Sequence, residues 1–386
     1  MLGSERLGQG LRVRRRGRNA PARQKKVAWL CLFGKARFDE AVFLSKGRTI
    51  RPFCSSAGIE PRGASLGIQR AVVDFAADAP FGQVEAKIFE HHKIRLPKGF
   101  AARVAGRHAS AIEPAMASPR KRAGAAPAVL VAQVDGGMVP IVSAGPEGRR
   151  GSGKVLEWRE CKLALVRRDG EIEARYAATM GSPAESGAQL GALAERAGFG
   201  PECRVHGVGD GAVWIRSQFE DQFGAQAGYL VDMFHVCEYL EAAAPACRPA
   251  DPAGWVSEAK SLLLAGKPRL VLAMLFHFKE PRLRLAGAGQ APATPALDCH
   301  RYLSARIDQL DYPAAIAAGL PIGSGEVESA HRHIMQARLK RAGAWWSEEG
   351  AQAMLNLRVM RANGRWKEYW AAQAKLRKGC ALPKAA

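Results

Sequence analysis

Short apolar runs of strand length alternate with helical patterns in the middle of the chain. Residues 128–135 (AVLVAQVD) are apolar and β-prone, and two glycines that would break a strand follow them. The same patterns predict further strands at 138–143, 158–166, 171–179, 204–209 and 228–231, and helices at 188–197, 214–223 and from about residue 234. Consecutive strands followed by alternating helix and strand indicate an α/β fold, a mixed sheet with helices on its faces.

Beyond residue 240 the strand pattern disappears. Apolar residues recur at helical spacing in 262–264, 270–278 and 303–310, between segments rich in Gly and Pro. We therefore expect a large all-helical insertion over residues 241–319. The sequence from residue 319 to 346 then reads GLPIGSGEVESAHRHIMQARLKRAGAWW, which predicts one helix with Ser324 as its N-cap and Gly343 as its stop.

The segment before the strands has a mostly helical pattern. Val84 and Ile88 have helical spacing ahead of a break at residues 92–94, and a second run then places Phe100 and Val104 on one face. The other face of that run is basic, with Lys98, Arg103 and Arg107. This arrangement resembles a helix-turn-helix, so residues 29–125 are predicted to form a helical DNA-binding region that ends in a linker. Ordinary helical hairpins have the same pattern, and both interpretations stay open.

Charge changes this picture most at the two ends. Residues 1–28 hold nine Lys or Arg and one acid with little apolar periodicity, which predicts a flexible basic arm, and residues 346–386 are predicted to form a basic helical tail. The whole chain has 57 Lys and Arg against 36 Asp and Glu, a formal charge of +21. Such a surplus favours a polyanionic partner, with nucleic acid as the first candidate.

Other classes of protein fit the sequence poorly. The longest apolar runs are far shorter than the roughly 20 residues that a membrane span needs, so no membrane association is expected. The eight cysteines are scattered without a CxxC pair, which disfavours a structural zinc site or a disulfide framework. With no secretory apolar segment at the N-terminus, we expect a cytoplasmic protein with reduced thiols.

Three acidic residues are candidate metal ligands because of their positions at the ends of predicted strands and the start of a predicted helix. Asp135 and Asp210 each end a predicted strand beside glycines, and Glu328 lies in the first turn of the helix after Ser324. Each aspartate alone is explained most simply as a turn residue. Held together, three carboxylates would select Mg²⁺ or Mn²⁺, and two such ions about 3.5 to 4 Å apart catalyse in-line displacement at phosphorus.

Six strings carry a resemblance to a known family. They are VDGG (134–137), GDGAVWI (209–215), DMFHVCEYL (232–240), GLPIGSGEVESA (319–330), RLKRAGAWW (338–346) and RANGRWKEYW (361–370). In order and spacing they resemble insertion-sequence transposases of the ISKra4 family, over roughly residues 125 to 370. The resemblance implies a ribonuclease-H-like catalytic core at 126–240 and 320–345, interrupted by the insertion. It also implies a DDE triad of Asp135, Asp210 and Glu328, with Glu326 as the alternative third acid.

The resemblance implies a bacterial, nucleoid-associated enzyme that cuts transposon ends and joins them to target DNA. Its partners would be the double-stranded terminal inverted repeats and target DNA, and a homodimer or larger oligomer would assemble on them. Two other interpretations stay open, a catalytically inactive transposase that only binds DNA and a ribonuclease-H-like nuclease.

Further residues are candidates for supporting roles. Asp232 and His235 resemble a (C/D)xxH signature and could bind DNA or brace the active site, although a helix-start Asp and an ordinary His explain them as well. The near P-loop GRRGSGKV (148–155) lacks the Ser or Thr that would bind Mg²⁺, so we interpret it as a DNA-facing hairpin. The residues expected to contact DNA are Arg149, Arg150, Lys154, Arg332, Arg338 and Lys340. Trp345, Trp346, Trp366 and Trp370 could stack on bases, but core packing is the favoured interpretation.

Overall fold

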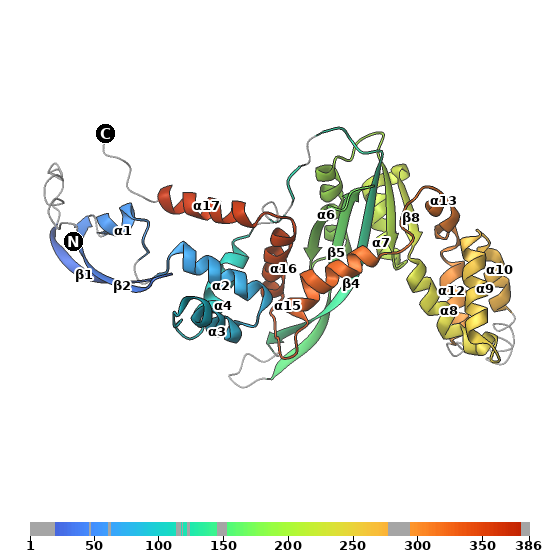
Figure 1. Ribbon diagram of the computed structural model, residues 1–386, viewed down its shortest axis with the longest axis horizontal. Coiled ribbons are helices and arrows are strands. Elements are labelled where there is room, and N and C mark those ends of the chain that lie inside the picture. The colour runs from blue at the N-terminus through green and yellow to red at the C-terminus, as the bar shows by residue number, and fades with distance from the viewer. Residues whose placement is uncertain are drawn as a thin grey trace. The chain divides into compact units, whose positions relative to one another are not determined.

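The computed structural model describes residues 20–45, 48–60, 63–112, 117, 119–121, 124–144, 153–276 and 294–379. The chain divides into two compact units (Figure 1). Unit 1 combines Met1–Ala76, Phe81–Ala105 and Lys367–Ala386, and unit 2 combines Ala77–Pro80 with Gly106–Trp366.

Unit 2 is built on a five-stranded mixed sheet. Its strands are β4 (Val129–Ala144), β5 (Lys154–Arg168), β6 (Arg175–Thr179), β7 (Arg204–Gly209) and β8 (Ala227–Val231), in the order β6-β5-β4-β7-β8. The pairs β4–β5 and β5–β6 are antiparallel, whereas β4–β7 and β7–β8 are parallel. This mixed sheet is compatible with the ribonuclease-H-like fold that the motif resemblance implied.

Two details of the predicted strands were wrong. Strand β4 continues through Gly136 and Gly137 instead of breaking there, because β5 pairs with both glycines along the whole ladder. Strand β6 begins only at Arg175, so residues 171–174 lie outside the sheet.

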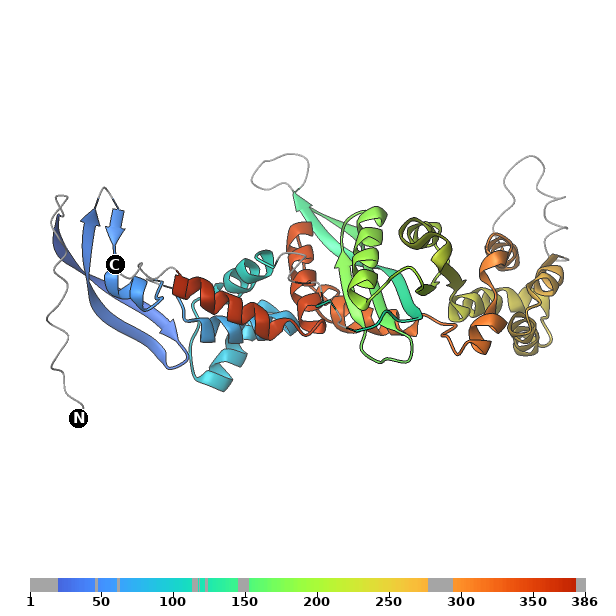
Figure 2. The same cartoon turned by 90° about the horizontal axis from the view of Figure 1, so that it is seen from above.

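Helices cover both faces of this sheet (Figures 1 and 2). On one face, α6 (Pro183–Ala197) and α7 (Val213–Phe223) pack Leu190, Leu193 and Phe219 against Leu130 and Val205. Helix α6 starts at a capping box made by Ser182 and Glu185 and ends at Gly198, whose φ of 102° suits a glycine. The other face carries α14 (Gly325–Ala330), the π-helical turn η3 (His331–Gln336), α15 (Ala337–Leu339) and α16 (Glu348–Ala362).

A helical block separates β8 from α14 in the sequence. It comprises α8 (Met233–Cys247), α9 (Pro252–Leu264), α10 (Pro268–Phe276), α12 (Pro295–Ser304), the 3-10 turn η2 (Ile307–Gln309) and α13 (Tyr312–Ala317). Its buried cluster includes Trp255, Leu263 and Tyr312 and continues into Leu230 and Val231 of β8. Within the described residues the expected insertion is helical, with no strand.

Unit 1 opens with a sheet that the sequence analysis missed. Strands β1 (Ala20–Cys31), β2 (Gly34–Ser45) and β3 (Arg48–Ile50) are antiparallel, so the predictions of a flexible arm through residue 28 and of helices from residue 27 are wrong for these residues. The basic run at residues 23–26 hid the alternation because it lies in the exposed part of β1. The helices that follow are α1 (Pro52–Ser56), α2 (Leu66–Asp78), α3 (Phe81–His92) and α4 (Phe100–Ser110), with α17 (Trp366–Gly379) from the C-terminal region.

The two helices of the expected helix-turn-helix are present as α3 and α4. Lys98, Arg103 and Arg107 are exposed, whereas Val104 is buried, as the pattern predicted. The seven cysteines in the described ranges are all free. None of the helices in those ranges is both long and apolar enough to cross a membrane.

Candidate functional site

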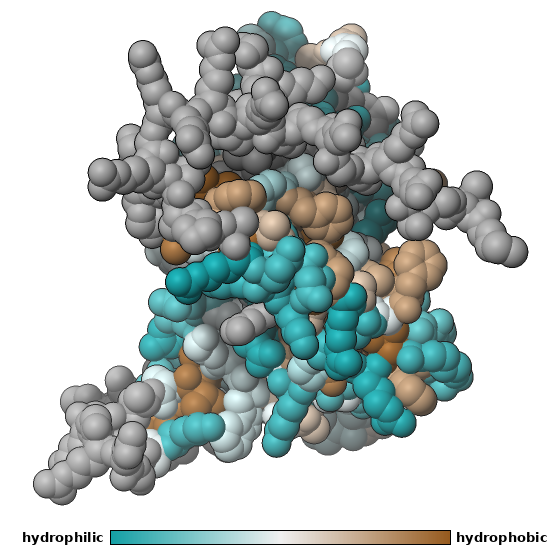
Figure 3. Space-filling model, turned by 90° about the vertical axis from the view of Figure 1, so that its left-hand side faces the viewer, coloured by the Kyte–Doolittle hydropathy of each residue, from teal (hydrophilic) through white to brown (hydrophobic). Residues whose placement is uncertain are grey.

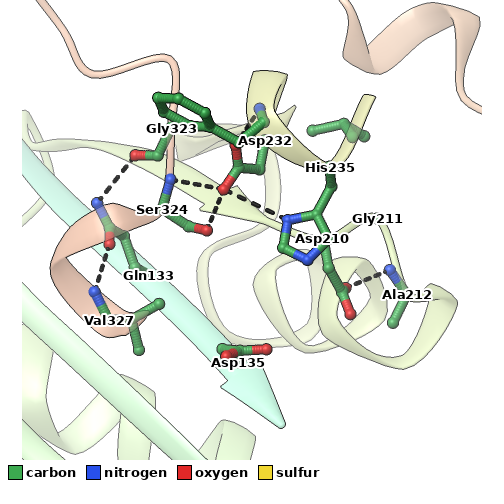
Figure 4. Close-up of polar contacts among 12 residues, drawn as sticks. Gln133, Asp135, Asp210, Gly211, Ala212, Asp232, His235, Gly323, Ser324 and Val327 are labelled. Atoms are coloured by element: carbon green, nitrogen blue, oxygen red, sulfur yellow. Dashed lines mark hydrogen bonds and ion pairs between the residues drawn. The ribbon is translucent and has the colours of Figure 1, made fainter. Parts of the chain in front are cut away.

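Three aspartates lie at the same level across three parallel strands. Gln133 of β4 pairs with Val208 of β7, and Gly209 of β7 pairs with Val231 of β8. Continuing this register places Asp135, Asp210 and Asp232 in one row. Asp210 and Asp232 follow the carboxyl ends of β7 and β8, whereas Asp135 lies inside the longer strand β4. Because neighbouring strands are about 4.8 Å apart, residues in one row have neighbouring side chains. Figure 4 shows Asp135, Asp210 and the ring of His235 around the same space.

After the helical block the chain returns to this edge of the sheet. The turn before α14 forms several hydrogen bonds there, with residues of β7 and of the start of α8. Its contacts are Pro321 O with His206 Nε2 at 2.8 Å, Ile322 O with Met233 N at 3.0 Å, and Ser324 N with Asp232 Oδ2 at 2.9 Å. These bonds come from β7 and from the start of α8, so the turn is fixed relative to the row of aspartates.

Gln133 adds a fourth attachment, from inside β4. Its side chain is fully buried, its Oε1 accepts a hydrogen bond from Val327 N at 2.9 Å, and its Nε2 donates to Gly323 O at 3.4 Å (Figure 4). Val327 is the residue before Glu328. The orientation of the first turn of α14, and with it the position of Glu328, therefore depends on this amide.

Glu328 and Glu326 have different surroundings. One ligand atom each from Glu328, Asp232 and His235 lie within 4.8 Å of one another, and this is the group of three that could hold a metal ion within the described ranges. Asp135 and Asp210 are outside that close group. Glu326 instead forms a two-pronged ion pair with Arg167 of β5, with its carboxylate oxygens 2.8 and 2.9 Å from Nε and Nη2.

Ser324 precedes α14 but does not cap it as predicted. The side chain makes no capping bond to the helix, because its hydroxyl donates to Asp232 Oδ2. Asp232, which is fully buried, also accepts a hydrogen bond from Phe234 N at 2.6 Å and lies 3.5 Å from His235 Nδ1. Asp232 thus starts α8 and fixes the turn before α14 with one carboxylate.

Protonation differs among these groups. Burial raises the pKa of Asp135, and the charge of Asp210 adds to this effect, although His331 and the Gly136 amide oppose it. Burial opposes the ionisation of Asp232, but hydrogen bonds from His235 and Ser324 lower its pKa. The hydrogen bond with Asp232 raises the pKa of His235 to about 9. Burial is thus the main cause of the raised pKa of Asp135, and the neighbouring carboxylate Asp232 is the main cause of the raised pKa of His235.

His331 contacts Asp135 from the π-helical turn. Its Nε2 lies 3.4 Å from Asp135 Oδ2 and 3.2 Å from Asp135 O, and its side chain is 3% exposed. Gly137 permits this approach, because a Cβ there would collide with Met335 and lie 3.0 Å from two ring atoms of His331. The second glycine of VDGG therefore has a packing role.

Arg358 of α16 stabilises the π-helical turn from the other side. Its side chain is 8% exposed; Nε donates to Ile334 O at 2.6 Å and Nη2 donates to His333 O. A π-helical turn leaves main-chain groups without their usual helical partners, and such turns are frequent at functional sites. Arg358 supplies donors to two of the carbonyls in the turn that carries His331.

The residues expected to contact DNA fall in different environments. Arg149 and Arg150 lie outside the described residues. Lys154, Arg332 and Lys340 are exposed, and Lys154 Nζ lies 4.7 Å from the centre of the Trp345 ring.

Arg338 does not fit the expectation of a phosphate contact. It is 3% exposed and its guanidinium lies over the ring of Trp346, while burial lowers its pKa to about 10. Direct contact with DNA is therefore not proposed for Arg338. Among the tryptophans, Trp346 and Trp370 are buried, Trp366 is half-buried and Trp345 is 61% exposed, so only Trp345 is open enough to stack on a base.

Sequence reasoning missed Gln133, Arg167 and Arg358, and it missed the contact of His331 with Asp135. One signal was available for Gln133, a polar residue with no turn nearby in the apolar run AVLVAQVD. The partners of the two arginines are distant in the sequence, and no local pattern marks them.

The fold and the site define an α/β protein with a mixed sheet, a helical block inserted before its last acid, and a carboxylate-rich edge. No protein-family model matches the chain, and neither does any curated protein. Among solved structures, the chain is similar to the Drosophila P element transposase strand transfer complex, with a TM-score of 0.32 and 9% sequence identity over 81% of this chain and 80% of that one.

Proposed function

We propose that this chain is a DNA transposase that cuts transposon ends and joins them to target DNA. The observation that carries the proposal is the row of Asp135, Asp210 and Asp232 across three parallel strands, with Glu328 attached beside it. The motif resemblance and the formal charge of +21 agree with a reaction on DNA. In this proposal the chain acts as a dimer or larger oligomer on double-stranded ends and target.

The donor set suits Mg²⁺ or Mn²⁺. Asp135, Asp210 and Glu328 offer carboxylate oxygens, the hard ligands that these ions select. Burial raises the pKa of Asp135 most and the charge of Asp210 adds to it, so a cation among the carboxylates would favour the ionised form of Asp135. Asp135, Asp210 and Glu328 would hold the ions, two in number by our proposal. Bound divalent ions would supply an activated attacking oxygen and would stabilise the leaving oxygen at phosphorus.

Glu328 is preferred to Glu326 as the third acid because Glu326 is committed to Arg167. Asp232 is assigned a supporting role, since its oxygens already accept bonds from Ser324 and Phe234. His235 and His331 lie against the carboxylates as imidazole donors. His331 orients Asp135, and His235 neutralises part of the negative charge at this edge.

Exposed cations near the acid helix would position the DNA backbone. Arg332 lies in η3, Lys340 follows α15, and Lys154 begins β5; all three are exposed. Each contact of this kind adds to affinity without reading the base sequence, and it makes binding sensitive to salt.

The test compares the full chain with Asp210→Asn and with the matched change Asp221→Asn, at an exposed carboxylate on α7. Supercoiled plasmids that carry the DNA flanking the gene are incubated with Mg²⁺, and nicked, linear and joined products are separated on gels. We expect metal-dependent cutting and joining by the wild type and by Asp221→Asn. Asp210→Asn should lose activity by about 100-fold or more.

Three outcomes would contradict the proposal in different ways. Equal activity of Asp210→Asn would remove Asp210 from the chemistry. Cutting without joining would indicate a ribonuclease-H-like nuclease. DNA binding without metal-dependent cutting would indicate an inactive transposase that serves as a DNA-binding protein.

A further inference from the structure

The sheet of unit 1 has one packed side and one open side. Side chains on alternate residues of β1 and β2 share a side, and on the packed side Val27, Glu40 and Val42 are buried. Helix α1 lies against this side, with the rings of Phe38 and Phe53 5.3 Å apart and Cys54 N donating to Glu40 Oε1 at 2.8 Å. The described residues of β1 and β2 that face the opposite side are all exposed or half-buried: Gln24, Lys26, Ala28, Leu30, Lys35, Arg37, Asp39 and Ala41.

The open side is basic. Register places Lys26 on β1 next to Asp39, and Lys35 and Arg37 on β2 opposite Leu30 and Ala28. Lys26, Lys35 and Arg37 are exposed. Arg23 and Lys25 are exposed as well, but the register places them opposite Val42 and Glu40, on the packed side. In the described part of the chain none of these five cations forms an ion pair.

The acids of the hairpin do not balance this charge. Glu40 is buried and its Oε2 lies 3.1 Å from Arg51 Nη1, so its charge is already paired, and Asp39 is the one exposed carboxylate among the described residues of β1 and β2. Figure 3, which faces the part of the chain that holds β1 and β2, shows hydrophilic side chains gathered on the surface with apolar patches between them.

The turn between β1 and β2 is unusual in composition. Cys31 pairs with Gly34, which leaves Leu32 and Phe33 as a two-residue turn, and Gly34 has a φ of 106°. Short hairpin turns favour Asn, Asp and Gly, whereas this one exposes Leu32 by 37% and Phe33 by 100%. An aromatic ring that lies wholly in water at the tip of a basic ribbon is positioned for a partner and contributes nothing to packing.

We propose that the β1–β2 ribbon is a DNA-binding arm that lies in a groove of duplex DNA. Lys26, Lys35 and Arg37 contact phosphates, and Phe33 presses against the bases at the end of the arm. The partner rests on the proposed function, but the surface is a separate one, made of residues that take no part in the carboxylate site.

Size and charge both favour this partner. Two strands about 4.8 Å apart form a ribbon that the major groove, about 12 Å wide, can admit. Twelve-residue strands reach about 40 Å, roughly one helical turn of DNA. On the open side, Lys35, Arg37 and Lys26 lie at three successive levels, those of Leu30, Ala28 and Asp39, so the charge follows the ribbon away from its tip. In the major groove an apolar side chain such as Phe can contact the methyl group of thymine.

The test measures binding of the full chain to a labelled 30-base-pair duplex of random sequence by fluorescence anisotropy, over a range of salt concentrations. The triple variant Lys26→Ala, Lys35→Ala, Arg37→Ala is compared with a matched triple in the helical block, Lys260→Ala, Lys267→Ala, Arg269→Ala, whose side chains are also exposed. Phe33→Ala is measured beside them. Circular dichroism checks that each variant is folded.

We expect the ribbon triple to bind at least about 10-fold more weakly at moderate salt, with a slope of log K against log salt that is smaller by about 3 units. Phe33→Ala should weaken binding without changing that slope, because it removes no charge. The control triple should have the smaller effect on both quantities.

Other results would overturn the inference. The ribbon is not the arm if its triple variant binds as tightly as the wild type or loses no more than the control. Vesicles with and without phosphatidylserine test the other polyanionic surface: if Phe33→Ala abolishes binding to anionic vesicles and leaves DNA affinity unchanged, the ribbon contacts a membrane instead.

The inference and the proposed function can fail separately. Unchanged DNA affinity of the ribbon variants, together with metal-dependent cutting that Asp210→Asn abolishes, would reject the arm alone. Ribbon-dependent binding without metal-dependent cutting under any condition would reject the transposase reaction and keep the arm.

Discussion

Replacing Gln133 tests whether the acid helix is positioned from inside the sheet. Gln133→Leu keeps the volume of the side chain but removes both of its hydrogen bonds to the segment that carries Glu328. The buried amide of Val327 would lose this acceptor and keep only the carbonyl of Ser324, at 3.0 Å, so the cost should lie near the lower end of about 1 to 3 kcal/mol. The bond to Gly323 O is long, at 3.4 Å, and adds little.

We therefore expect the free energy of unfolding to fall by about 1 kcal/mol and the unfolding temperature to fall by about 2 to 4 °C. Because the first turn of α14 would lose one of its attachments to the sheet, the stabilisation by added Mg²⁺ and the metal-dependent activity should fall as well. Thermal unfolding with and without Mg²⁺ and the plasmid assay measure these quantities.

Gln226→Leu is the matched control. Gln226 Nε2 donates to three carbonyls, those of Gly200, Pro201 and Cys203, at 3.0, 3.0 and 2.7 Å, away from the carboxylates. This variant should lose comparable stability and keep its response to Mg²⁺. If Gln133→Leu keeps the same response to Mg²⁺ as Gln226→Leu, the side-chain amide of Gln133 contributes only to stability and does not position Glu328.

Three further predictions concern other groups. Glu328→Gln should abolish metal-dependent cutting, whereas Glu326→Gln should retain it. Glu326→Gln should lower the free energy of unfolding by about 1 kcal/mol or less, because its ion pair with Arg167 is partly exposed. Retained cutting by Glu328→Gln would reverse the assignment of the third acid. Arg358→Met should lower the free energy of unfolding by about 3 kcal/mol, measured in urea, because several carbonyls lose their donor; a change below about 1 kcal/mol would contradict the role given to this side chain. Burial raises the pKa of Glu40, but bonds from the Cys54 amide and Arg51 together lower it by more, so the net pKa is below its usual value. The ionised Glu40 therefore stabilises the fold fully above the unfolded pKa, and this stabilisation is lost as pH falls through the folded pKa. Glu40→Gln should flatten the loss of stability below about pH 4.5, and an unchanged acid-unfolding profile would refute this.

The sheet of unit 2 could be predicted because its strands bury residues in a local pattern. Residues 128–135 form an apolar run, and Asp210 beside its glycines marks the end of β7 in the sequence itself, although Asp135 lies inside β4. Strand β1 could not be recognised in the same way, because its first half is basic and exposed and shows no apolar run. Its hairpin was also hidden, since the turn to β2 consists of Leu32 and Phe33, residues that short hairpin turns do not favour.

The supports of the candidate site could not be predicted for a different reason. Gln133 meets Gly323 and Val327 across 190 and 194 positions of sequence, and Ser324 gives its hydroxyl to Asp232 across 92. Local chemistry assigned Ser324 to helix capping, since capping is what a serine before a helix usually does. In the structure the Ser324 hydroxyl bonds to the carboxylate of Asp232 and not to the helix. A buried charge that loses a donor costs more free energy than an uncapped helix, so the distant partner determines the role of Ser324.

The helical block between β8 and α14 leaves and rejoins the sheet at one point, because Met233 N donates to Ile322 O across its two ends. Inside this loop of chain, α12 and the turn after it are bonded to the end of β7, since Tyr302 Oη donates to Asp210 O at 2.6 Å and Arg306 Nε donates to Gly211 O at 2.7 Å. The block therefore has two parts, helices that brace the acids and helices that lie further away. An engineer who wishes to attach a new domain without moving the acids should attach it at the exposed turn 265–267 between α9 and α10 and leave α12 intact.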